Sequence, residues 1–398
     1  MTSVFMSKPS VLCSAGYGIE EVWEAVTSGS QKGIKKVKAL NGKEFFAGRI
    51  EDSLLEKTSS RYDMRIIRIE EKSLKGLSEK ISLVIEKYGR ERIGVCVGSC
   101  DNGTELSLKG HRKYLTEGAF DKDYSLEIQG ADYVSTFISE KYGVKGPSMT
   151  FSTACSSSAG AIIKAAELIR AGICDAVIAG GVDIASDTVL MGFDSLEAVS
   201  AELTNPFSAN RHGITLGEAG AFFVLSKDSL DDEKVVLLGY GESADAYHMT
   251  SPEPSGNGAK RAMTKALEMA GIKPEEVDYL NTHGTGTKFN DSMEAKAIDE
   301  VFGEHKVPSS TIKPITGHTL GAAGALEAAV CWECLVKNKN EGKVKLPVQV
   351  WDEVKDLEMP SINIISKNNN KNTGKVKICM SNSFAFGGAN SSLVIGVL

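Results

Sequence analysis

The stretch Thr-Ala-Cys-Ser-Ser-Ser-Ala-Gly-Ala-Ile, residues 153–162, indicates the fold because it joins two different kinds of sequence. An extended run ends at Phe151, and small and aliphatic residues typical of a packed helix begin at Ala159. A strand that turns sharply into a helix exposes the side chain at the bend and directs helical N–H groups toward it. These groups and the helix dipole favour a thiolate and bind the oxyanion of an attacked acyl group. Cys155 is therefore a candidate acyl acceptor, with a buried structural thiol as the equally weighted alternative.

Two of the six histidines lie in glycine-containing turns further along the chain. His283 follows the apolar run 277–280 within NTHGTGT, and His318 lies within TGHTLGAAGALE, just before a run of small residues typical of a buried helix. A lone loop histidine is more often structural, but two such turns and a candidate nucleophile form a constellation. Neutral imidazoles can donate hydrogen bonds to a carbonyl that is becoming an enolate. The three residues together predict carbanion chemistry on a thioester.

With three further motifs, these segments resemble the elongating (type I/II) β-ketoacyl-[acyl-carrier-protein] synthases of the thiolase-like superfamily. The further motifs are a segment at 205–218 that begins NPFS and ends GE, DAYHMTSP at 245–252, and SNSFAFGGAN at 381–390. The resemblance implies an α/β fold, a duplicated α-β-α-β-α five-layer arrangement with two mixed sheets. It also implies a Cys-His-His site, unlike the Cys-His-Asn of chain-initiating synthases or the second catalytic cysteine of thiolases.

The resemblance assigns a role to each matching residue of this site. Cys155 would accept the growing acyl chain from a carrier-protein thioester, while His283 and His318 bind the malonyl thioester carbonyl. Loss of carbon dioxide would give an enolate that attacks the acyl group. The backbone N–H groups of Cys155 and Phe386 would hold the oxyanion of the tetrahedral intermediate.

Lys313 is implied to order this site through a carboxylate. Glu294 is the candidate partner, because it lies three residues beyond Asp291 and would share its helix face. An ordinary solvated lysine is the alternative, but the position of Lys313 five residues before His318 argues against it.

The segment 384–390 resembles the gating loop of the family. The flexible pair Gly387 and Gly388 would let the ring of Phe386 swing away from the cysteine, although Phe384 and Phe386 also alternate like a half-buried strand. Two residues depart from the family pattern and would stiffen the gate or reshape the pocket wall. These are Ala385 and Ala389, which replace the usual Gly and Thr.

The family limits acyl-chain length at about the position of Asp101, next to Cys100. An acid that faces an alkyl tunnel costs several kcal/mol unless it is paired or hydrated. We therefore expect a short, polar or unsaturated acyl chain, as in a specialised polyene or polyketide pathway. The equally weighted alternative is that Asp101 turns outward as a loop residue.

A structural monovalent cation, Na+ or K+, is also implied by the resemblance, with a hydrogen-bond network as the alternative. The matching oxygen donors are Asn281, Glu327, Ser381 and Asn382. No further cofactor is expected to be required, because the acyl and malonyl groups arrive on the phosphopantetheine arm of acyl carrier protein.

Carrier proteins are acidic, so docking on a chain of net charge −7 requires a local basic patch. Lys57, Arg61 and Arg65 recur every four residues and predict one helical face, with Arg68 adjacent. A solvated helix face is the more common cause of such spacing. The resemblance further implies a homodimer, or a heterodimer with a second ketosynthase-like subunit.

Composition narrows the function classes and the location. The chain has 45 basic and 52 acidic residues and no aromatic–basic stripe, which argues against a nucleic-acid partner. No signal-like segment and no apolar stretch of about 18 residues is found, so we expect a cytoplasmic protein without a membrane span. The eight cysteines are scattered through apolar segments, as in proteins with reduced thiols, and the CxxC at 331–334 is interpreted as helix interior.

Apolar runs predict buried strands, and the stretches between them predict helices. The predicted strands are 93–97, 176–179, 221–225, 235–238, 312–316 and 393–397, and the predicted helices are 160–171, 259–270, 293–301 and 321–336. The acidic segment 227–233 predicts a boundary between two thiolase-like halves. The half 1–231 would carry the nucleophile, dimer interface and acyl pocket, and the half 232–398 would carry His283, Lys313, His318 and the gating loop.

Three functions remain open from the sequence. The leading hypothesis is an active condensing enzyme of fatty acid or specialised polyene or polyketide biosynthesis. The alternative is a malonyl-thioester decarboxylase or thiolase-like acyltransferase without condensation. A non-catalytic subunit that sets chain length is disfavoured, because such subunits typically lack the nucleophile and Cys155 is present.

Overall fold

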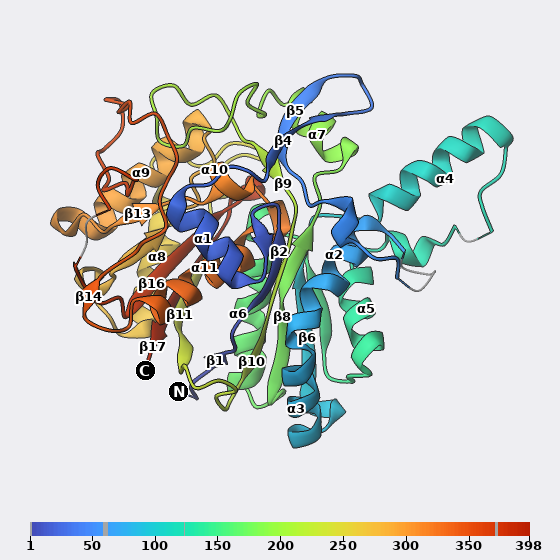
Figure 1. The fold of residues 1–398 in the computed structure, drawn as a ribbon, viewed down its shortest axis with the longest axis horizontal. Helices are drawn as coiled ribbons and strands as arrows, with labels where there is room; N and C mark the ends of the chain where they lie inside the picture. The colour runs from blue at the N-terminus through green and yellow to red at the C-terminus, as the bar shows by residue number, and fades with distance from the viewer. Residues whose placement is uncertain (1, 59–62, 123, 371–372) are drawn as a thin grey trace.

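Two mixed β-sheets, flanked and separated by helices, form the computed structural model (Figure 1), which describes residues 2–58, 63–122, 124–370 and 373–398. The short strand β1 (Phe5–Met6) pairs with β10 on one side and β11 on the other. It therefore joins the two sheets into one hydrogen-bonded sheet of twelve strands, of which β2 and β3 lie off the main path.

Both sheets have the same succession of strand directions. In the N-terminal sheet, in spatial order, the strands are β7 (Ser148–Phe151), β6 (Ile93–Gly98), β8 (Ala176–Asp183), β10 (Ala219–Ser226) and β2 (Ser10–Cys13). In the C-terminal sheet they are β13 (Ser309–Ser310), β12 (Tyr279–Asn281), β16 (Ile378–Phe384), β17 (Ala389–Val397) and β11 (Val235–Ala244). In each sheet the first three strands are parallel and the next two pair antiparallel. The predicted duplicated five-layer fold is confirmed.

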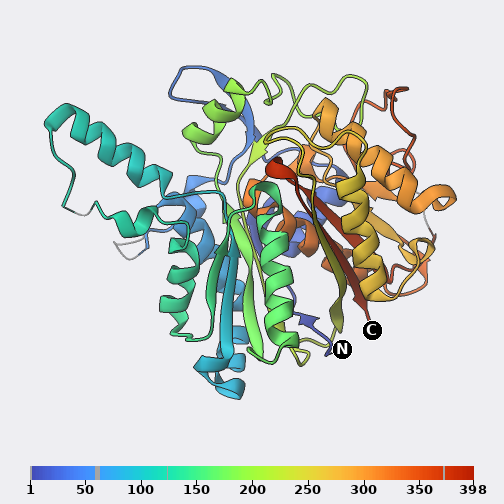
Figure 2. The same ribbon diagram turned by 180° about the vertical axis from the view of Figure 1, so that it is seen from behind.

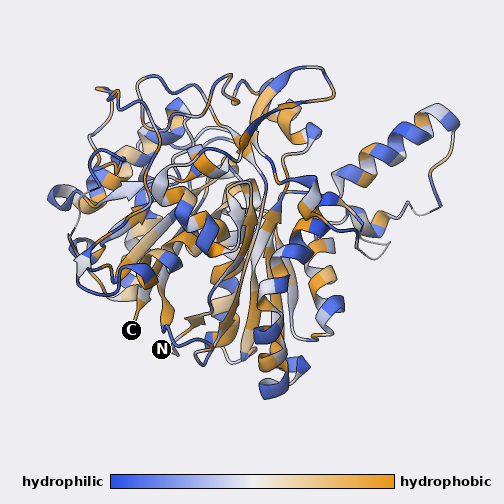
Figure 3. Ribbon diagram, viewed as in Figure 1, coloured by the Kyte–Doolittle hydropathy of each residue, from blue (hydrophilic) through white to orange (hydrophobic). Residues whose placement is uncertain are grey.

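Two helices lie between the sheets, α6 (Ser157–Arg170) and α11 (Ala323–Lys337), and each contacts strands of both. In α11 every residue from Ala323 to Leu335 is buried. A helix that is apolar on all faces and rich in Ala and Gly can pack closely against a neighbour on every side. Figure 3 shows the central elements as largely hydrophobic and the outer helices as mixed.

The outer layers cover the remaining face of each sheet. The helices α2 (Arg65–Leu74), α3 (Ser78–Tyr88) and α5 (Tyr133–Tyr142) pack on the N-terminal sheet. On the C-terminal sheet α8 (Asn257–Ala270) packs against β11 and β17, and α9 (Lys288–Phe302) packs against α8. The helix α4 (Thr104–Glu117) projects from the body, on the right in Figure 1 and on the left in the reverse view of Figure 2.

The remaining elements are short and lie around this framework. They are α1 (Ile19–Ser28), α7 (Asp187–Ser195), α10 (Lys313–Thr316), β3 (Gly16–Tyr17), the small sheet of β4 (Ile34–Lys38), β5 (Glu44–Gly48) and β9 (Leu216–Gly217), and the pair β14 (Gly342–Lys343) and β15 (Thr373–Gly374). Within the described ranges, the search for a helix both long and apolar enough to cross a membrane found none.

Two predicted elements differ from the structure. The predicted strand 312–316 is wrong, because the strand there is β13, Ser309–Ser310, and Lys313–Thr316 forms the helical turn α10. Pro314 stands in its first turn, where the fixed φ of proline suits a helix and its missing N–H is not needed. The predicted basic helical face is also wrong: Lys57 lies in irregular chain, α2 begins only at Arg65, and Arg61 lies outside the described residues.

Candidate active site

Cys155 lies at a sharp turn between β7 and the central helix α6. The turn is a short 3-10 helix, Ala154–Ser156, and Ala154 has a φ of 50°, which is uncommon for a residue other than glycine. The hydroxyl of Ser157 braces this backbone, because it accepts from Thr153 N at 2.9 Å and donates to Ala154 O at 2.6 Å. The predicted strand–turn–helix arrangement around Cys155 is therefore present.

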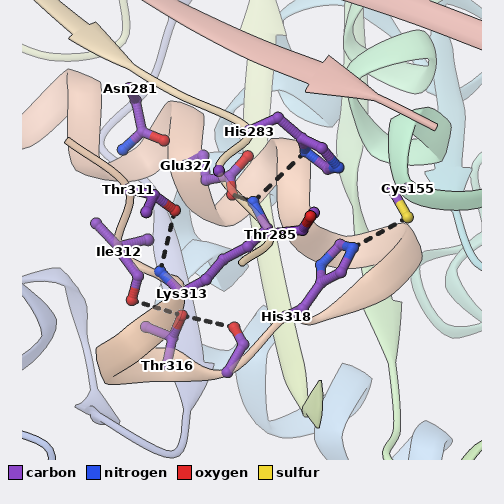
Figure 4. Close-up of polar contacts among 12 residues, drawn as sticks. Cys155, Asn281, His283, Thr285, Thr311, Ile312, Lys313, Thr316, His318 and Glu327 are labelled. Atoms are coloured by element: carbon purple, nitrogen blue, oxygen red, sulfur yellow. Dashed lines mark hydrogen bonds and ion pairs between the residues drawn. The ribbon is translucent and has the colours of Figure 1, made fainter. Parts of the chain in front are cut away.

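His318 precedes the other central helix at the corresponding place of the second half. The 3-10 turn before α11, Leu320–Ala322, also begins with a residue whose φ is 50°. The Nε2 atom of His318 lies 3.0 Å from the Sγ atom of Cys155 (Figure 4). The duplicated fold therefore brings together a cysteine from one half and an imidazole from the other.

His283 lies on the turn between β12 and α9, and two buried acids of α9 hold this turn. Glu294 accepts hydrogen bonds from the backbone N–H groups of His283 and Gly284, both at 2.7 Å. Asp291 accepts from Thr285 N at 3.1 Å and from Phe207 N at 2.8 Å. The helix face that Asp291 and Glu294 were predicted to share therefore faces the histidine turn. The rings of His283 and His318 lie 5.3 Å apart, centroid to centroid.

Lys313 forms its ion pair with Glu327 of α11, and both side chains are 2% exposed. The prediction that Glu294 is its partner is therefore wrong. Both oxygens of Glu294 are occupied by backbone N–H groups, which leaves Glu327 as the acid in direct contact with the ammonium. The Nζ atom of Lys313 also lies 3.5 Å from Nδ1 of His283 (Figure 4).

Burial sets the protonation states of the site. Desolvation, and then the charge of Lys313, hold the pKa values of His283 and His318 well below the usual histidine range. Burial raises the pKa of Cys155 to about 12, against the opposing effects of Lys313 and the Phe386 N–H. The sequence predicted a thiolate favoured by helical N–H groups, and desolvation outweighs them here. The resting site therefore holds a neutral thiol and two neutral imidazoles at pH 7.

The buried acids of the site are also shifted. Burial raises the pKa values of Glu294 and Glu327 to about 7, and Lys313 opposes both shifts. A buried carboxylate that lacks water is costly unless N–H groups or a cation stabilise it, as both acids have here. Each carboxyl therefore titrates close to neutral pH in the folded protein.

A cavity of about 380 Å³ opens onto these side chains. Cys155, His283 and His318 line it together with Phe384 and Phe386 of the predicted gate. The wall further out includes Arg211, Asp245 and the first turn of α9. The reactive groups therefore face a partly open cavity whose described lining is mostly apolar.

The gating loop contacts the cavity through two rings. Phe386 stacks on Phe193 of α7 with centroids 5.8 Å apart, and Phe384 meets His283 edge-on at 6.2 Å. Gly387 and Gly388 have φ angles of 80° and 76°, the left-handed conformation that glycine adopts most easily. Ala385 and Ala389, the two residues that differ from the family pattern, are hydrogen-bonded to each other across the base of the loop. The N–H of Ala385 donates to the carbonyl oxygen of Ala389 at 3.0 Å.

Asp245 is hydrogen-bonded to the predicted gating loop, a contact that the sequence analysis did not foresee although it quoted the motif. The backbone N–H of Asp245 donates to Gly388 O at 2.9 Å, and its carboxylate accepts from Asn390 Nδ2 at 2.7 Å. Asp183 was also missed: at the end of β8 it accepts from Cys100 N and from Gly321 N, at 2.9 and 2.8 Å. A carboxylate that directly follows an apolar strand was the available signal for Asp183.

Asp101 is buried, and its carboxylate is occupied by local hydrogen bonds. It accepts from Gly103 N at 2.7 Å, from the Tyr133 hydroxyl at 2.8 Å and from the Thr104 hydroxyl. Asp101 is 5% exposed, so the alternative that it turns outward is wrong. The residues that line the catalytic cavity include neither Asp101 nor Cys100, so this acid gives no support for a polar acyl chain.

Two of the predicted docking arginines, Arg65 and Arg68, are already paired within the chain. Arg65 donates to Glu218 at 2.7 Å and forms a second ion pair with Asp52, and Arg68 pairs with Asp63 at 2.7 Å. Their side chains are 15% and 28% exposed. Much of the positive charge that was predicted to attract an acidic partner is neutralised locally.

Three of the four predicted cation ligands carry buried oxygens without a hydrogen-bond partner in the described chain: Asn281 Oδ1, Glu327 Oε2 and Ser381 Oγ. Asn281 and Ser381 are direct neighbours in the register of β12 and β16. Asn382 differs, because its Oδ1 accepts from the Ser392 hydroxyl at 2.8 Å. Unpaired, buried oxygen donors are what a hard monovalent cation requires.

A cysteine at a strand–turn–helix elbow and two neutral imidazoles line one cavity of a thiolase-like fold, an arrangement suited to an acyltransferase. The family model for the β-ketoacyl synthase N-terminal domain matches residues 10–230, and that for the C-terminal domain matches residues 235–341. The chain therefore belongs to the β-ketoacyl synthase family of carbon–carbon bond-forming acyltransferases.

Individual relatives agree with this assignment. The chain is 33% identical to 3-oxoacyl-[acyl-carrier-protein] synthase 2 of Coxiella burnetii, over 97% of this chain and 96% of that one. It is 36% identical to the mitochondrial 3-oxoacyl-[acyl-carrier-protein] synthase of Arabidopsis thaliana, over 78% and 70%. Among solved structures, it is similar to the ketosynthase ApeO, in complex with its chain length factor ApeC, from Xenorhabdus doucetiae. That match has a TM-score of 0.91 and 36% identity and covers 100% of this chain and 98% of the other.

Proposed function

We propose that this chain is an elongating β-ketoacyl-[acyl-carrier-protein] synthase that carries out a decarboxylative Claisen condensation. The observation that carries the proposal is the contact of the Cys155 thiol with one neutral imidazole, beside a second one, in a cavity of about 380 Å³. A subunit that only sets chain length has no need of this arrangement.

The first half-reaction transfers an acyl group to Cys155. The sulfur attacks the carbonyl of an acyl thioester carried on phosphopantetheine, and Nε2 of His318, 3.0 Å away, takes the thiol proton during the attack. The N–H groups of Cys155 and Phe386 hold the oxyanion. Collapse breaks the old carbon–sulfur bond, and the proton leaves with the pantetheine thiol.

The second half-reaction forms the carbon–carbon bond. The ammonium of Lys313 can only donate hydrogen bonds, so Nδ1 of His283, which lies next to it, must accept. The single ring proton of the neutral His283 imidazole is therefore on Nε2. His283, and His318 as the tautomer that carries its proton on Nε2, then donate hydrogen bonds to the malonyl thioester carbonyl while the malonyl carboxylate leaves as carbon dioxide. The resulting enolate attacks the acyl-cysteine, and collapse breaks the carbon–sulfur bond and releases the β-ketoacyl thioester. The Cys155 thiolate then takes a proton from solvent, relayed by His318, so that both imidazoles end neutral.

A Na+ or K+ ion fits the unpaired oxygens of Asn281, Ser381 and Glu327. When bound, it would supply positive charge beside a buried carboxylate, and it takes no part in the chemical steps. Asn382 completes the set only through its backbone or after its Oδ1 releases Ser392.

The proposed partners are acyl carrier protein and a second ketosynthase-like chain, either another copy or a distinct subunit as in the ApeO–ApeC complex. β7 is an edge strand of its sheet, and the projecting helix α4 and the 3-10 turn Leu126–Gln129 expose apolar side chains that a partner would cover. The most exposed of these are Leu115 at 84% and Leu126 at 83%. We assign the reaction to fatty acid or specialised polyene or polyketide synthesis, which the relatives support as 3-oxoacyl-[acyl-carrier-protein] synthases and as a ketosynthase that pairs with a chain length factor. The eight free cysteines support a reducing, cytoplasmic location.

The test is mass spectrometry of the protein after incubation with acyl carrier proteins loaded with different chains, and then with malonyl carrier protein. We expect acyl mass on Cys155 that disappears as a β-ketoacyl product two carbons longer forms. Loss of carbon dioxide from malonyl groups without acylation of Cys155 would instead identify the decarboxylase alternative. Repeating the assay with a co-purified second subunit separates that outcome from a missing partner.

A further inference from the structure

The first turn of α9 presents Lys288 and Phe289 at the outer wall of the catalytic cavity. Both residues line the cavity that also contains Cys155, and the ring of Phe289 is 72% exposed. Lys288 is exposed and forms no ion pair within the described part of the chain. An unpaired cation beside an exposed aromatic ring is an unusual combination at the entrance of a reactive cavity, and neither residue takes part in the proposed chemistry.

The backbone of this turn is held firmly from beneath. Arg211, which is 3% exposed, donates to Lys288 O at 3.2 Å and to Ser292 Oγ at 2.8 Å, and it forms a buried ion pair with Asp356. The hydrogen bonds from the Glu358 N–H and from Arg211 lower the pKa of Asp356, Lys288 adds a smaller charge effect, and the direct ion-pair partner of that acid is Arg211. The backbone of Lys288 is therefore fixed by hydrogen bonds, while its ammonium group is free to pair with an acid of another molecule.

Other charges at the entrance do not neutralise Lys288. His212 is exposed and lines the same cavity, whereas the acids of the lining are Glu197, beyond α7, and Asp245, which is bound to Asn390. The positive end of the α9 dipole lies at the same turn. The entrance therefore combines positive charge with exposed apolar area, which is complementary to an acidic protein surface that has an apolar patch.

We propose that Lys288 and Phe289 form a docking point for an acidic acyl carrier protein. Lys288 pairs with a carboxylate of the carrier and Phe289 packs against its apolar surface, which aligns the phosphopantetheine arm with the cavity. This inference rests on the proposed function and adds a docking surface distinct from the 57–68 segment, whose Arg65 and Arg68 are paired internally.

The test compares K288E and F289S with the matched control K377E. Lys377 is an exposed lysine before β16, at the end of that strand opposite Phe384, and its side chain has no ion-pair partner in the described chain. KM is measured for an acyl group on a purified acyl carrier protein and for the same group on N-acetylcysteamine. Binding of the unacylated holo-carrier protein to each variant is titrated separately at low and high salt.

We expect K288E to raise the ratio of the two KM values roughly five- to tenfold, and F289S to raise it several-fold. K288E also weakens the salt dependence of carrier binding, while K377E leaves the ratio and the binding unchanged. Equal KM changes with both substrates, or equal effects of K288E and K377E, would overturn the docking point and leave the proposed function intact. Absence of condensation by the wild-type protein would refute the proposed function, while the binding titration would still decide on the docking point.

Discussion

The ammonium nitrogen of Lys313 lies 3.5 Å from Nδ1 of His283, in a part of the core where both side chains are almost fully buried. The same ammonium is ion-paired with Glu327. We expect this contact to make Lys313 a positioning residue, because it favours the tautomer of His283 that points an N–H into the cavity. Burial, and then the charge of Lys313, hold the pKa of His283 well below its usual range, so the imidazole stays neutral.

Replacing Lys313 by methionine should destabilise the fold by about 3–5 kcal/mol, because Glu327 would remain buried without its cation. The double variant K313M/E327M should recover most of this loss, because apolar side chains replace the whole pair. Malonyl decarboxylation should stay about 100-fold lower in both variants, since His283 loses its fixed tautomer. Denaturant unfolding and a carbon dioxide assay measure the two effects, and full decarboxylation by the double variant would show that Lys313 is only structural.

Alkylation of Cys155 by iodoacetamide should accelerate about tenfold per pH unit between pH 7 and 9 without reaching a plateau. Burial raises the pKa of this thiol to about 12, so the thiolate fraction rises throughout this range. Peptide mass spectrometry follows the modification at Cys155, with C155A as the blank. A plateau at neutral pH would mean that the helical N–H groups stabilise the thiolate more than burial opposes it.

The two glycines of the gate provide a matched comparison. Alanine at either position must adopt a left-handed φ, which costs about 1–2 kcal/mol. A Cβ at Gly387 would meet open space, whereas one at Gly388 would lie 2.7 Å from the Cβ of Asp245. We therefore expect G388A to slow acylation of Cys155 by about tenfold more than G387A does, measured by rapid-quench mass spectrometry. Equal rates for the two variants would exclude the contact with Asp245 as a determinant of gating.

Potassium or sodium chloride should raise the melting temperature by roughly 3 °C relative to choline chloride at equal ionic strength, if a cation fills the unpaired oxygens. In S381A we expect a smaller difference in melting temperature between these salts and choline chloride, because one of the three unpaired oxygens is removed. Differential scanning calorimetry in the three salts measures this. An identical melting temperature in all three would assign these oxygens to a hydrogen-bond network alone.

Local sequence was sufficient to predict the turns that carry the reactive side chains. Cys155, His283 and His318 each stand where a run of regular periodicity gives way to small or glycine residues, and the structure brings the three together. The spacing of Asp291 and Glu294 correctly predicted a shared helix face. What this face contacts could not be derived from spacing, since its partner is a turn of the same segment and not Lys313.

The wrong predictions concern the partner of Lys313, the basic helix and the strand 312–316. The first depends on contacts between segments that are distant in the sequence, and the other two relied on short patterns that fit more than one structure. Glu327 lies on a different element from Glu294, and only the tertiary packing of α11 brings it to Lys313. Four-residue spacing from Lys57 to Arg65 predicted a helix without any apolar periodicity to support it. Pro314 was the available sign that the segment after β13 is a helical turn.

The division of the site between the two halves has a consequence for how the protein is made on the ribosome. Cys155 and His318 are 163 residues apart in the chain and meet only in the finished fold. At roughly 5–20 residues per second of synthesis, the cysteine emerges about ten to thirty seconds before the imidazole that contacts it. The nascent chain therefore carries a thiol without its imidazole while the next 163 residues are made, and acyl-transfer chemistry begins only after the last strands have closed the second sheet.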